Sequence, residues 1–353
     1  MKASAEAAWD FVDGTLNDAA EIKRLASLSR IEYDRQREAA AAAMRCRVGS
    51  LDKAVEEERA KNGSGAAPGQ GRPIELPERE PWPHPVNGAA LLDEITEATK
   101  RHMVMAPGAP EVTALWVLHT HAIDAVNISP RLGITSPCPG CGKTTLQDML
   151  YQLTPRPLLA TNITAAAVFR TVEIAKPTLL CDEADSWLGD NAELRGILNT
   201  GHRRGGSVIR LVGDDHDARQ FATFCASTIS MIGKLPATLT SRSVPIPLQR
   251  KLPGETIAVF DDAAAQAFLP LARKAARWAA DNMEKLRGAK PQMPAEITNR
   301  DADNWRVLIA IADTAGGNWP TEARRIAVAM TGPDTSSENL LADIRAAFAE
   351  SGR

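Results

Sequence analysis

Aromatic side chains are scarce in this chain. Phenylalanine, tryptophan and tyrosine make up 5% of its 353 residues, and tyrosine occurs only twice. Proteins that hold single-stranded nucleic acid without sequence preference stack its bases on successive aromatic rings. The scarcity therefore argues against an extended base-stacking platform.

Long apolar runs and a dominant charge are lacking as well. No apolar run approaches the roughly 20 residues that a membrane-spanning helix needs. Residues 1–6 are not followed by the apolar core of a signal peptide. The formal net charge is −3, so a general surface for polyanions is not indicated. We expect a cytoplasmic protein without membrane contacts.

The cysteines are an odd set of five, which argues against a disulfide framework: Cys46, Cys138, Cys141, Cys181 and Cys225. Cys138 and Cys141 have the spacing of a redox or metal pair, but no second pair completes a zinc site. His119 and His121 are two further candidate ligands. No carboxylate or cysteine accompanies them at ligand spacing, which favours two hydrogen-bonded histidines on a buried helix.

The segment 134–145, Ile-Thr-Ser-Pro-Cys-Pro-Gly-Cys-Gly-Lys-Thr-Thr, predicts a phosphate-binding loop between a strand over 132–135 and a helix over 144–150. The N–H groups that begin such a helix, and the positive end of its dipole, face an anion. Lys143 can reach the β- and γ-phosphates of ATP, and the Thr144 hydroxyl can bind Mg²⁺. We expect the nucleotide to be bound by Pro139, Gly140, Cys141, Gly142, Lys143, Thr144 and Thr145.

Pro137 departs from the usual motif. The pattern G-x-x-x-x-G-K-S/T places glycine at position 137, where this chain has proline. Because proline fixes φ and removes an N–H, the first turn of the loop should be stiffer and its phosphate cradle altered.

A second motif follows at 178–185. The apolar run 178–181 suits a buried parallel strand, and it ends at Asp182 and Glu183. Asp182 would hold Mg²⁺, and Glu183 would orient and polarise the attacking water. An acidic helix start after an ordinary strand is the alternative. Together the two motifs predict an α/β P-loop ATPase with a parallel sheet, using ATP and Mg²⁺.

Arg242 follows a third predicted strand, over 221–232. ATPases of the AAA+ type have a strand, a Leu-Pro segment and a Ser-Arg pair in this order, and their arginine reaches the nucleotide of a neighbouring subunit. Arg242 therefore resembles an arginine finger, which stabilises phosphoryl transfer. This role implies a homo-oligomeric ring, for which we expect a hexamer. A helix cap or a surface ion pair is the alternative for Arg242.

Positive charge is concentrated over 195–251, which holds nine basic and three acidic residues. Within it, residues 201–206 precede the alternating run 208–212 and predict a loop or hairpin lifted from the core. In ring helicases, loops from this part of the fold hold the nucleic-acid backbone. We expect contacts to DNA, in its single-stranded form, from Arg203, Arg204 and Arg210.

Arg203 and Arg204 also have an alternative assignment. They could contact the nucleotide of a neighbouring subunit or the acidic pair Asp214–Asp215.

Composition divides the chain into four parts. Residues 1–61 are charged and helical, 62–88 form a Pro/Gly-rich linker, 89–255 hold the ATPase core with its preceding helices, and 256–353 form a helical lid. In the first part, helices over 32–44 and 50–59 could form a helix-turn-helix that enters a DNA groove. Acidic residues on the second helix favour the alternative, a helical hairpin for oligomerisation or partner docking.

The lid is predicted from helical periodicity over 261–286, 303–315, 321–330 and 337–349. It could close over the nucleotide and pass hydrolysis on as subunit rotation. Arg300 or Arg306 could serve as a second phosphate sensor, with surface pairing to Asp301 or Asp303 as the alternative.

Six stretches, 116–121, 128–132, 179–185, 193–206, 212–216 and 301–305, resemble a family of phage- and plasmid-borne, helicase-like ATPases. It is the domain-of-unknown-function family numbered thirty-six thirty-one, and the resemblance covers about residues 82–345. It implies a core of AAA+ or superfamily-3 helicase type and a role beside DNA primase, a candidate partner, in replicating mobile elements. We expect an ATP-driven, helicase-like DNA motor. The alternative is a nucleotide-switched assembly or loading factor that binds a protein partner without unwinding DNA.

Overall fold

The computed structural model describes residues 11–12, 15–16, 18–61, 74–189, 191–213 and 216–331. Contacts divide the chain into two units, Met1–Glu75 and Leu76–Arg353. Three parts of the predictions lie outside the described residues: the helix over 337–349, residues 62–73 of the linker, and the Asp214–Asp215 pair.

The described residues of the first unit form two short strands and three helices: β1 (Phe11–Val12), β2 (Thr15–Leu16), α1 (Asp18–Ser27), α2 (Arg30–Ala43) and α3 (Val48–Lys61). Ser29 begins α2 with a capping box, in which its hydroxyl and the Glu32 carboxylate each accept from the other's backbone N–H. A small apolar core joins the three helices. The Tyr33 hydroxyl donates to Asp52 at 2.8 Å, which ties α2 to α3.

The second unit is an α/β structure around a sheet of five parallel strands. Their order is β4 (Pro157–Ala160), β5 (Thr178–Cys181), β8 (Ser227–Ile232), β3 (Arg131–Ser136) and β9 (Ser243–Pro247). Strands β3 and β5 are buried almost throughout because both sheet faces are covered, which suits the apolar run of β5. This confirms the predicted α/β class. Since the strands are parallel, all five carboxyl ends lie at one edge of the sheet.

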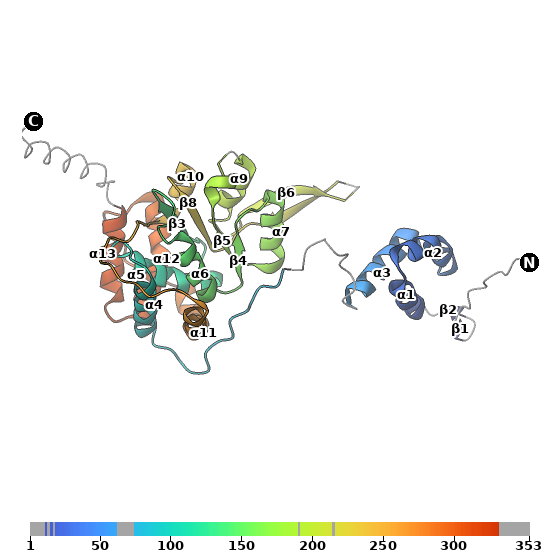
Figure 1. The fold of residues 1–353 in the computed structure, drawn as a ribbon, viewed down its shortest axis with the longest axis horizontal. Coiled ribbons are helices and arrows are strands. Elements are labelled where there is room, and N and C mark those ends of the chain that lie inside the picture. Colours follow the sequence, from blue (N-terminus) through green and yellow to red (C-terminus); the bar gives the residue numbers. More distant parts are fainter. Residues whose placement is uncertain are drawn as a thin grey trace, which may run out of the picture. The chain divides into compact units, whose positions relative to one another are not determined.

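Helices cover both faces of this sheet (Figure 1). The largest apolar core joins β3 and β9 to helices that flank them in sequence on both sides. The helices at residues 262–331 pack on α4, α5 and α6, so they share this core with the helices that precede the sheet. Within its described residues, the helices of this unit are α4 (Gly88–His102), α5 (Ala109–His121), η1 (Ile123–Ala125), α6 (Lys143–Leu153), α7 (Ala165–Ala175), α8 (Ala184–Trp187), α9 (Ala192–Thr200), α10 (Ala237–Thr240), α11 (Asp262–Arg287), α12 (Asn299–Ala315) and α13 (Trp319–Thr331).

An antiparallel hairpin, β6 (Ser207–Val212) and β7 (Asp217–Ala222), projects from the body beside α7 and α9 (Figure 1). It confirms the predicted loop or hairpin between the two core strands. The prediction of one strand over 221–232 is wrong in its first part. Phe221 and Ala222 end the hairpin, and β8 begins only at Ser227. Residues 221–232 form one largely apolar run, so composition could not show where the hairpin ends and the strand of the central sheet begins.

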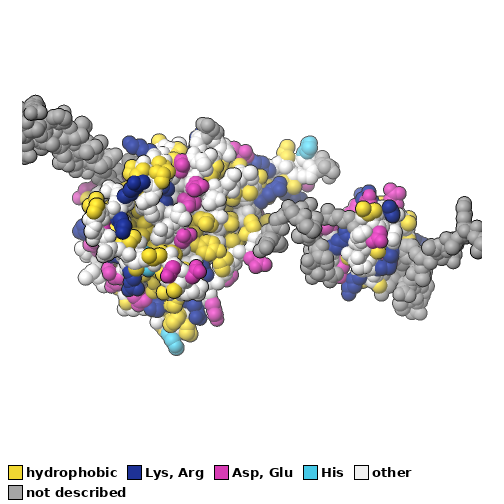
Figure 2. Space-filling view, in the orientation of Figure 1, with side chains coloured by type: hydrophobic (Ala, Val, Ile, Leu, Met, Phe, Trp, Pro, Cys, Tyr) yellow, Lys and Arg dark blue, Asp and Glu magenta, His cyan; other side chains and the backbone are white. Residues whose placement is uncertain are grey.

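Acidic and basic side chains are interspersed over the visible face (Figure 2), in agreement with the small net charge. In the part of the chain that the structure describes, no helix is both long enough and apolar enough to cross a membrane.

Candidate functional site

The predicted phosphate loop connects the carboxyl end of β3 to the first turn of α6. Gly140 and Gly142 have φ of +79° and +86°, left-handed conformations that glycine adopts without steric cost. Gly142 is the N-cap of α6 and offers no side-chain cap. The first N–H groups of α6 therefore lack intrahelical partners and can bind an anion at the loop.

A cavity of about 650 Å³ lies at this edge of the sheet. Asp182 and Glu183, which follow β5, line it together with the loop. Two segments that are distant in sequence thus meet because β3 and β5 are both adjacent to β8. All predicted nucleotide-binding residues line the cavity: Pro139, Gly140, Cys141, Gly142, Lys143, Thr144 and Thr145.

Lys143 is held at the mouth of the loop by a neutral partner. Its Nζ donates to Ser136 Oγ at 2.8 Å, and the Ser136 hydroxyl donates to the Cys138 carbonyl at 2.9 Å. No described carboxylate forms an ion pair with Lys143. The ammonium charge is therefore available to an anionic ligand.

Asp182 is buried, and its Oδ1 accepts from the backbone N–H of Glu183 at 2.9 Å. Glu183 has φ of +51°, which is uncommon outside glycine and is typical of functional sites. Its side chain is exposed and makes no hydrogen bond with a described residue. Burial and the Asp182 charge raise the pKa of Asp148 on α6.

Sequence reasoning missed two residues that organise this cavity. Gln147 of α6 donates to the Cys181 carbonyl and accepts from the Thr228 hydroxyl, both at 2.9 Å, so it joins α6 to β5 and β8. Arg250 donates to the Pro139 carbonyl at 3.1 and 2.9 Å and braces the loop from the chain after β9. Neither Gln147 nor Arg250 belongs to a recognisable sequence motif, so only the folded structure reveals these contacts.

Arg242 lies away from this cavity. Ser243 begins β9 and is in register with Arg131, the first residue of β3, whereas the loop follows Ser136 at the other end of β3. A strand of this length spans about 20 Å. Arg242 and the phosphate loop of the same chain therefore lie at opposite edges of the sheet.

A second cavity, of about 490 Å³, lies at the edge of the sheet where Arg242 is found and is lined by arginines; we call it the arginine pocket. Arg203, Arg242 and Arg300 line it, and among the described residues none of the three has an ion-pair partner. Burial and the nearby Arg300 charge lower the pKa of Arg242. Asp303 is the acidic residue lining this arginine pocket. Three uncompensated guanidinium groups favour an anionic ligand.

Hydrogen bonds hold the arginine pocket in shape. Arg300 Nη1 donates to Ser241 Oγ at 3.1 Å, and Asn304 Nδ2 donates to the Ser241 carbonyl at 3.3 Å. The Asn304 amide oxygen lies 2.7 Å from His202 Nε2. Arg242 Nη1 donates to the Thr238 carbonyl at 2.6 Å, which is the helix-capping alternative for this residue.

The predicted second sensors do not line the nucleotide cavity of their own chain. Arg300 lies in the arginine pocket, and Arg306 lines neither cavity. The alternative, pairing of either arginine with Asp301 or Asp303, is not observed either. The long α12 that carries both arginines packs on α5 and β9, which directs Arg300 to the amino edge of the sheet.

Arg131 is an arginine that sequence reasoning missed. It is 1% exposed, its Nη2 donates to the Leu198 carbonyl, and its Nε and Nη1 have no partner in the described structure. Burial lowers its pKa to about 10. A buried guanidinium with unused donors is costly, and it adds positive charge near Arg242.

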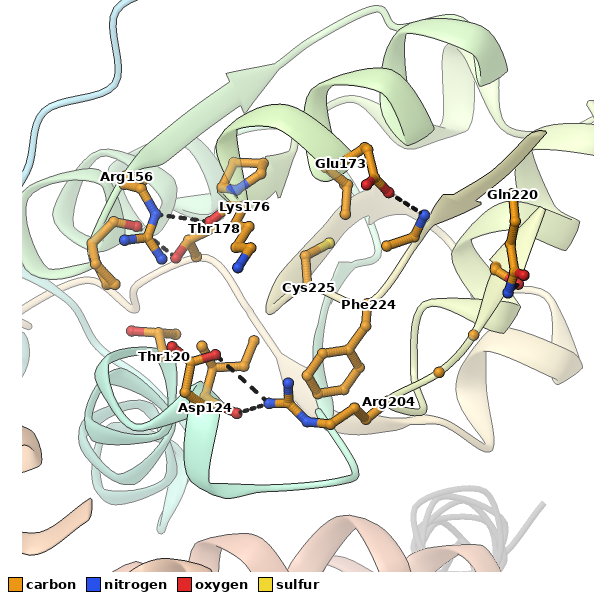
Figure 3. A pocket seen from close by; sticks show the side chains of 18 residues that line it. Thr120, Asp124, Arg156, Glu173, Lys176, Thr178, Arg204, Gln220, Phe224 and Cys225 are labelled. Atoms are coloured by element: carbon orange, nitrogen blue, oxygen red, sulfur yellow. Dashed lines mark hydrogen bonds and ion pairs between the residues drawn. The ribbon is translucent and has the colours of Figure 1, made fainter. Parts of the chain in front are cut away.

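The three predicted DNA contacts differ in availability. Arg204 donates to the Val126 and Ile123 carbonyls at 2.9 and 2.6 Å and lies 3.8 Å from Asp124. Figure 3 shows its guanidinium at the wall of a third cavity, of about 410 Å³, where it covers the Phe224 ring. These two hydrogen bonds, the ion pair with Asp124 and the contact with Phe224 engage Arg204 within the chain.

Arg210 is also engaged. It forms an ion pair with Glu193 at 2.5 Å and lies over the Phe169 ring. Arg203, in contrast, is exposed and its side chain makes no hydrogen bond with a described residue.

The paired histidines of α5 are hydrogen-bonded, as predicted. His119 Nε2 lies 2.9 Å from Ser129 Oγ, and His121 Nε2 lies 2.8 Å from the Leu153 carbonyl. Burial lowers the pKa of His119 to about 3. Within the described ranges, no group of three or more potential ligands is placed to hold a metal ion.

A family model matches the C-terminal part of the chain. Residues 247–353 match a family model described as "Protein of unknown function (DUF3631)", which includes α11–α13 but not the phosphate loop. "Uncharacterized 28.9 kDa protein in xis 5'region" from Saccharopolyspora erythraea is 38% identical over 110 residues, 29% of this chain and 41% of that protein. The chain thus spans less than half the length of this relative.

Two solved structures, both described as the A form apo structure of the NrS-1 C terminal region, are distant neighbours. They are 16% and 14% identical, with TM-scores of 0.36 and 0.33. The matches cover 70% and 67% of this chain and 55% and 53% of those chains.

Proposed function

We propose that this chain is a P-loop ATPase of AAA+ or superfamily-3 helicase type, acting as an oligomeric DNA motor in the replication of a mobile element. One observation carries the proposal. Residues 139–145 of the loop and first helical turn and the acidic pair Asp182–Glu183 line one cavity at the carboxyl ends of β3 and β5. Ligands of open α/β sheets bind at this edge.

The residues that line this cavity would have separate roles in phosphoryl transfer. Lys143 and the N–H groups of the loop would hold the β- and γ-phosphates. The Thr144 hydroxyl and the Asp182 carboxylate are hard oxygen donors that suit Mg²⁺, and both line the cavity. Bound Mg²⁺ would neutralise charge on the phosphate oxygens. The unpaired carboxylate of Glu183 would orient the attacking water.

The position of Arg242 favours an active site that two copies of the chain complete. The nucleotide cavity and the arginine pocket lie at opposite edges of one sheet. A head-to-tail contact between copies would bring the pocket of one to the cavity of the next, and such contacts form a ring when the rotation between copies closes. A hexamer is the expected form. Arg242 would then supply the transition-state cation in trans.

DNA binding would depend mainly on one of the three predicted arginines. Arg203 and the projecting hairpin remain available, while Arg204 and Arg210 are engaged within the chain. This engagement favours the second candidate, a nucleotide-switched loading factor that binds a protein partner without unwinding DNA. A primase partner follows only from the family resemblance.

Hydrolysis of ATP with and without single-stranded DNA separates the two candidates. For a motor we expect single-stranded DNA to raise the turnover of the full chain, because translocation couples each cycle to the strand. A loading factor would instead respond to its protein partner. If the chain neither binds nor hydrolyses ATP, both candidates fail.

A further inference from the structure

Two thiols face each other within the phosphate loop. Cys138 Sγ and Cys141 Sγ are 3.8 Å apart, and both cysteines are free. A disulfide joins sulfur atoms at about 2.05 Å, so the two sulfurs need to approach by roughly 1.8 Å. Pro139 and Gly140 are the two residues between them, and Gly140 already has positive φ. A small rearrangement of the loop is enough to join them.

The other three cysteines are less suited to oxidation to a disulfide. Burial raises the pKa of Cys225 to about 11 and that of Cys181 well above its usual range, which keeps both as unreactive thiols. Cys46 is exposed, but it lies in the first unit. Cys138 is half-buried and Cys141 lines the 650 Å³ cavity, so a small oxidant can reach the pair.

We propose that Cys138 and Cys141 form a reversible disulfide, a modification site for peroxide that closes the phosphate loop. The Cys138 sulfur attacks one peroxide oxygen, the O–O bond breaks, and a sulfenic acid and water form. The Cys141 sulfur then attacks that sulfur, the S–O bond breaks, and the second water leaves with the thiol proton. Two thiols are oxidised and one hydrogen peroxide is reduced to two waters. A dithiol reductant reverses the step by exchange.

The disulfide is coupled to Lys143 through one carbonyl. The Cys138 carbonyl accepts from the Cys141 thiol at 3.3 Å and from the Ser136 hydroxyl at 2.9 Å, and Ser136 Oγ in turn holds Lys143 Nζ. Oxidation removes the thiol donor and shifts the carbonyl that anchors Ser136. Because hydrogen bonds to phosphate weaken steeply with misalignment, the closed loop binds nucleotide poorly. This consequence rests on the proposed ATPase function, whereas the disulfide itself does not.

Peptide mass measurement tests the disulfide. Trypsin cleaves after Arg131 and Lys143, so one peptide, 132–143, contains both cysteines. After hydrogen peroxide treatment of the full chain and blocking of free thiols, we expect this peptide to lose two hydrogens and resist alkylation. Dithiothreitol should restore both thiols. Cys46→Ser is the matched control and should behave as the wild type. Alkylation of both loop cysteines after oxidation, or oxidation confined to Cys46, would overturn the proposal.

Binding of a fluorescent ATP analogue tests the closure of the loop. Oxidation should weaken binding by about tenfold or more, the value of one hydrogen bond to a charged group, and dithiothreitol should restore it. Cys138→Ser should bind equally well before and after peroxide. An oxidised, cross-linked wild type with unchanged affinity refutes the closure. If the reduced chain does not bind the analogue, the ATPase proposal fails, while the mass measurement still decides the disulfide.

Discussion

Arg131 and Ser136 are the two ends of strand β3: the Arg131 backbone N–H donates to the carbonyl of Arg242, which lines the arginine pocket, and the Ser136 hydroxyl accepts from Lys143 Nζ. One buried strand thus separates the proposed nucleotide-binding edge from a second edge where Arg203, Arg242 and Arg300 have no ion-pair partner among the described residues. Copies that stack edge to edge would place each arginine pocket against a neighbouring loop. This geometry connects the proposed chemistry to assembly.

Lys143→Ala should abolish nucleotide binding or lower turnover by about two orders of magnitude or more, because the ammonium is a preorganised charge in the cavity. Lys290→Ala, an exposed lysine outside both cavities, is the matched control. Titration with the fluorescent ATP analogue and a phosphate-release assay give the two readouts. Equal activity of the two variants would contradict the role of Lys143.

Glu183→Gln should bind ATP and stall, because an amide holds the position of the carboxylate but cannot polarise water as strongly. Single-turnover hydrolysis separates binding from chemistry. Hydrolysis at the wild-type rate would remove Glu183 from the role of water activation.

Arg242→Ala and Glu183→Gln should complement each other in mixed oligomers. An interface with intact Glu183 on one copy and intact Arg242 on the other is complete, so part of the ATPase activity should return on mixing. Specific activity should also rise with protein concentration. No recovery in oligomers shown to contain both variants, or full activity from a strict monomer, would exclude a trans-acting Arg242.

Arg203→Ala and Arg204→Ala should differ. Arg203→Ala should weaken binding of single-stranded DNA and reduce its salt dependence, since the exposed guanidinium has no partner among the described residues. Arg204→Ala should instead lower the free energy of unfolding by about 1–3 kcal/mol, because it removes hydrogen bonds to two carbonyls and the contact with Phe224. Loss of ATPase activity with unchanged DNA affinity in Arg203→Ala would move that residue to the nucleotide interface.

The free energy of unfolding should decrease as the pH falls, because His119 is buried in its neutral form. Its pKa is about 3 in the folded chain, so below the unfolded value near 6.5 only the unfolded chain takes up the proton. His119 therefore leaves the free energy of unfolding unchanged above pH 6.5. Between pH 6.5 and the folded pKa, it lowers that free energy by about 1.4 kcal/mol for each unit that the pH falls.

Urea unfolding at pH 7 and pH 5 checks this dependence on pH. His119→Gln should reduce the loss of stability between the two pH values, whereas His84→Gln, an exposed control, should not. The same loss in the wild type and in His119→Gln would show that His119 does not carry the effect.

Local motifs predicted the parts of the fold that neighbouring residues determine. The strand over 178–181, the helices of the C-terminal part up to residue 331 and the loop before Lys143 follow from apolar periodicity and glycine placement. The strand over 221–232 was misjudged because an apolar run does not reveal whether it pairs within a hairpin or joins the central sheet.

The sequence by itself determined which residues are candidates for one site, because the loop before Lys143 and the Asp182–Glu183 pair are contiguous motifs that can be recognised without a fold. Only the tertiary structure decided which distant residues serve that site and which do not. Arg250 braces the loop, and Arg300 joins Arg242 at the far edge, because strand order and helix packing place them there. The same packing engages Arg204 and Arg210 within the chain, since long-range contacts use side chains that composition alone leaves free.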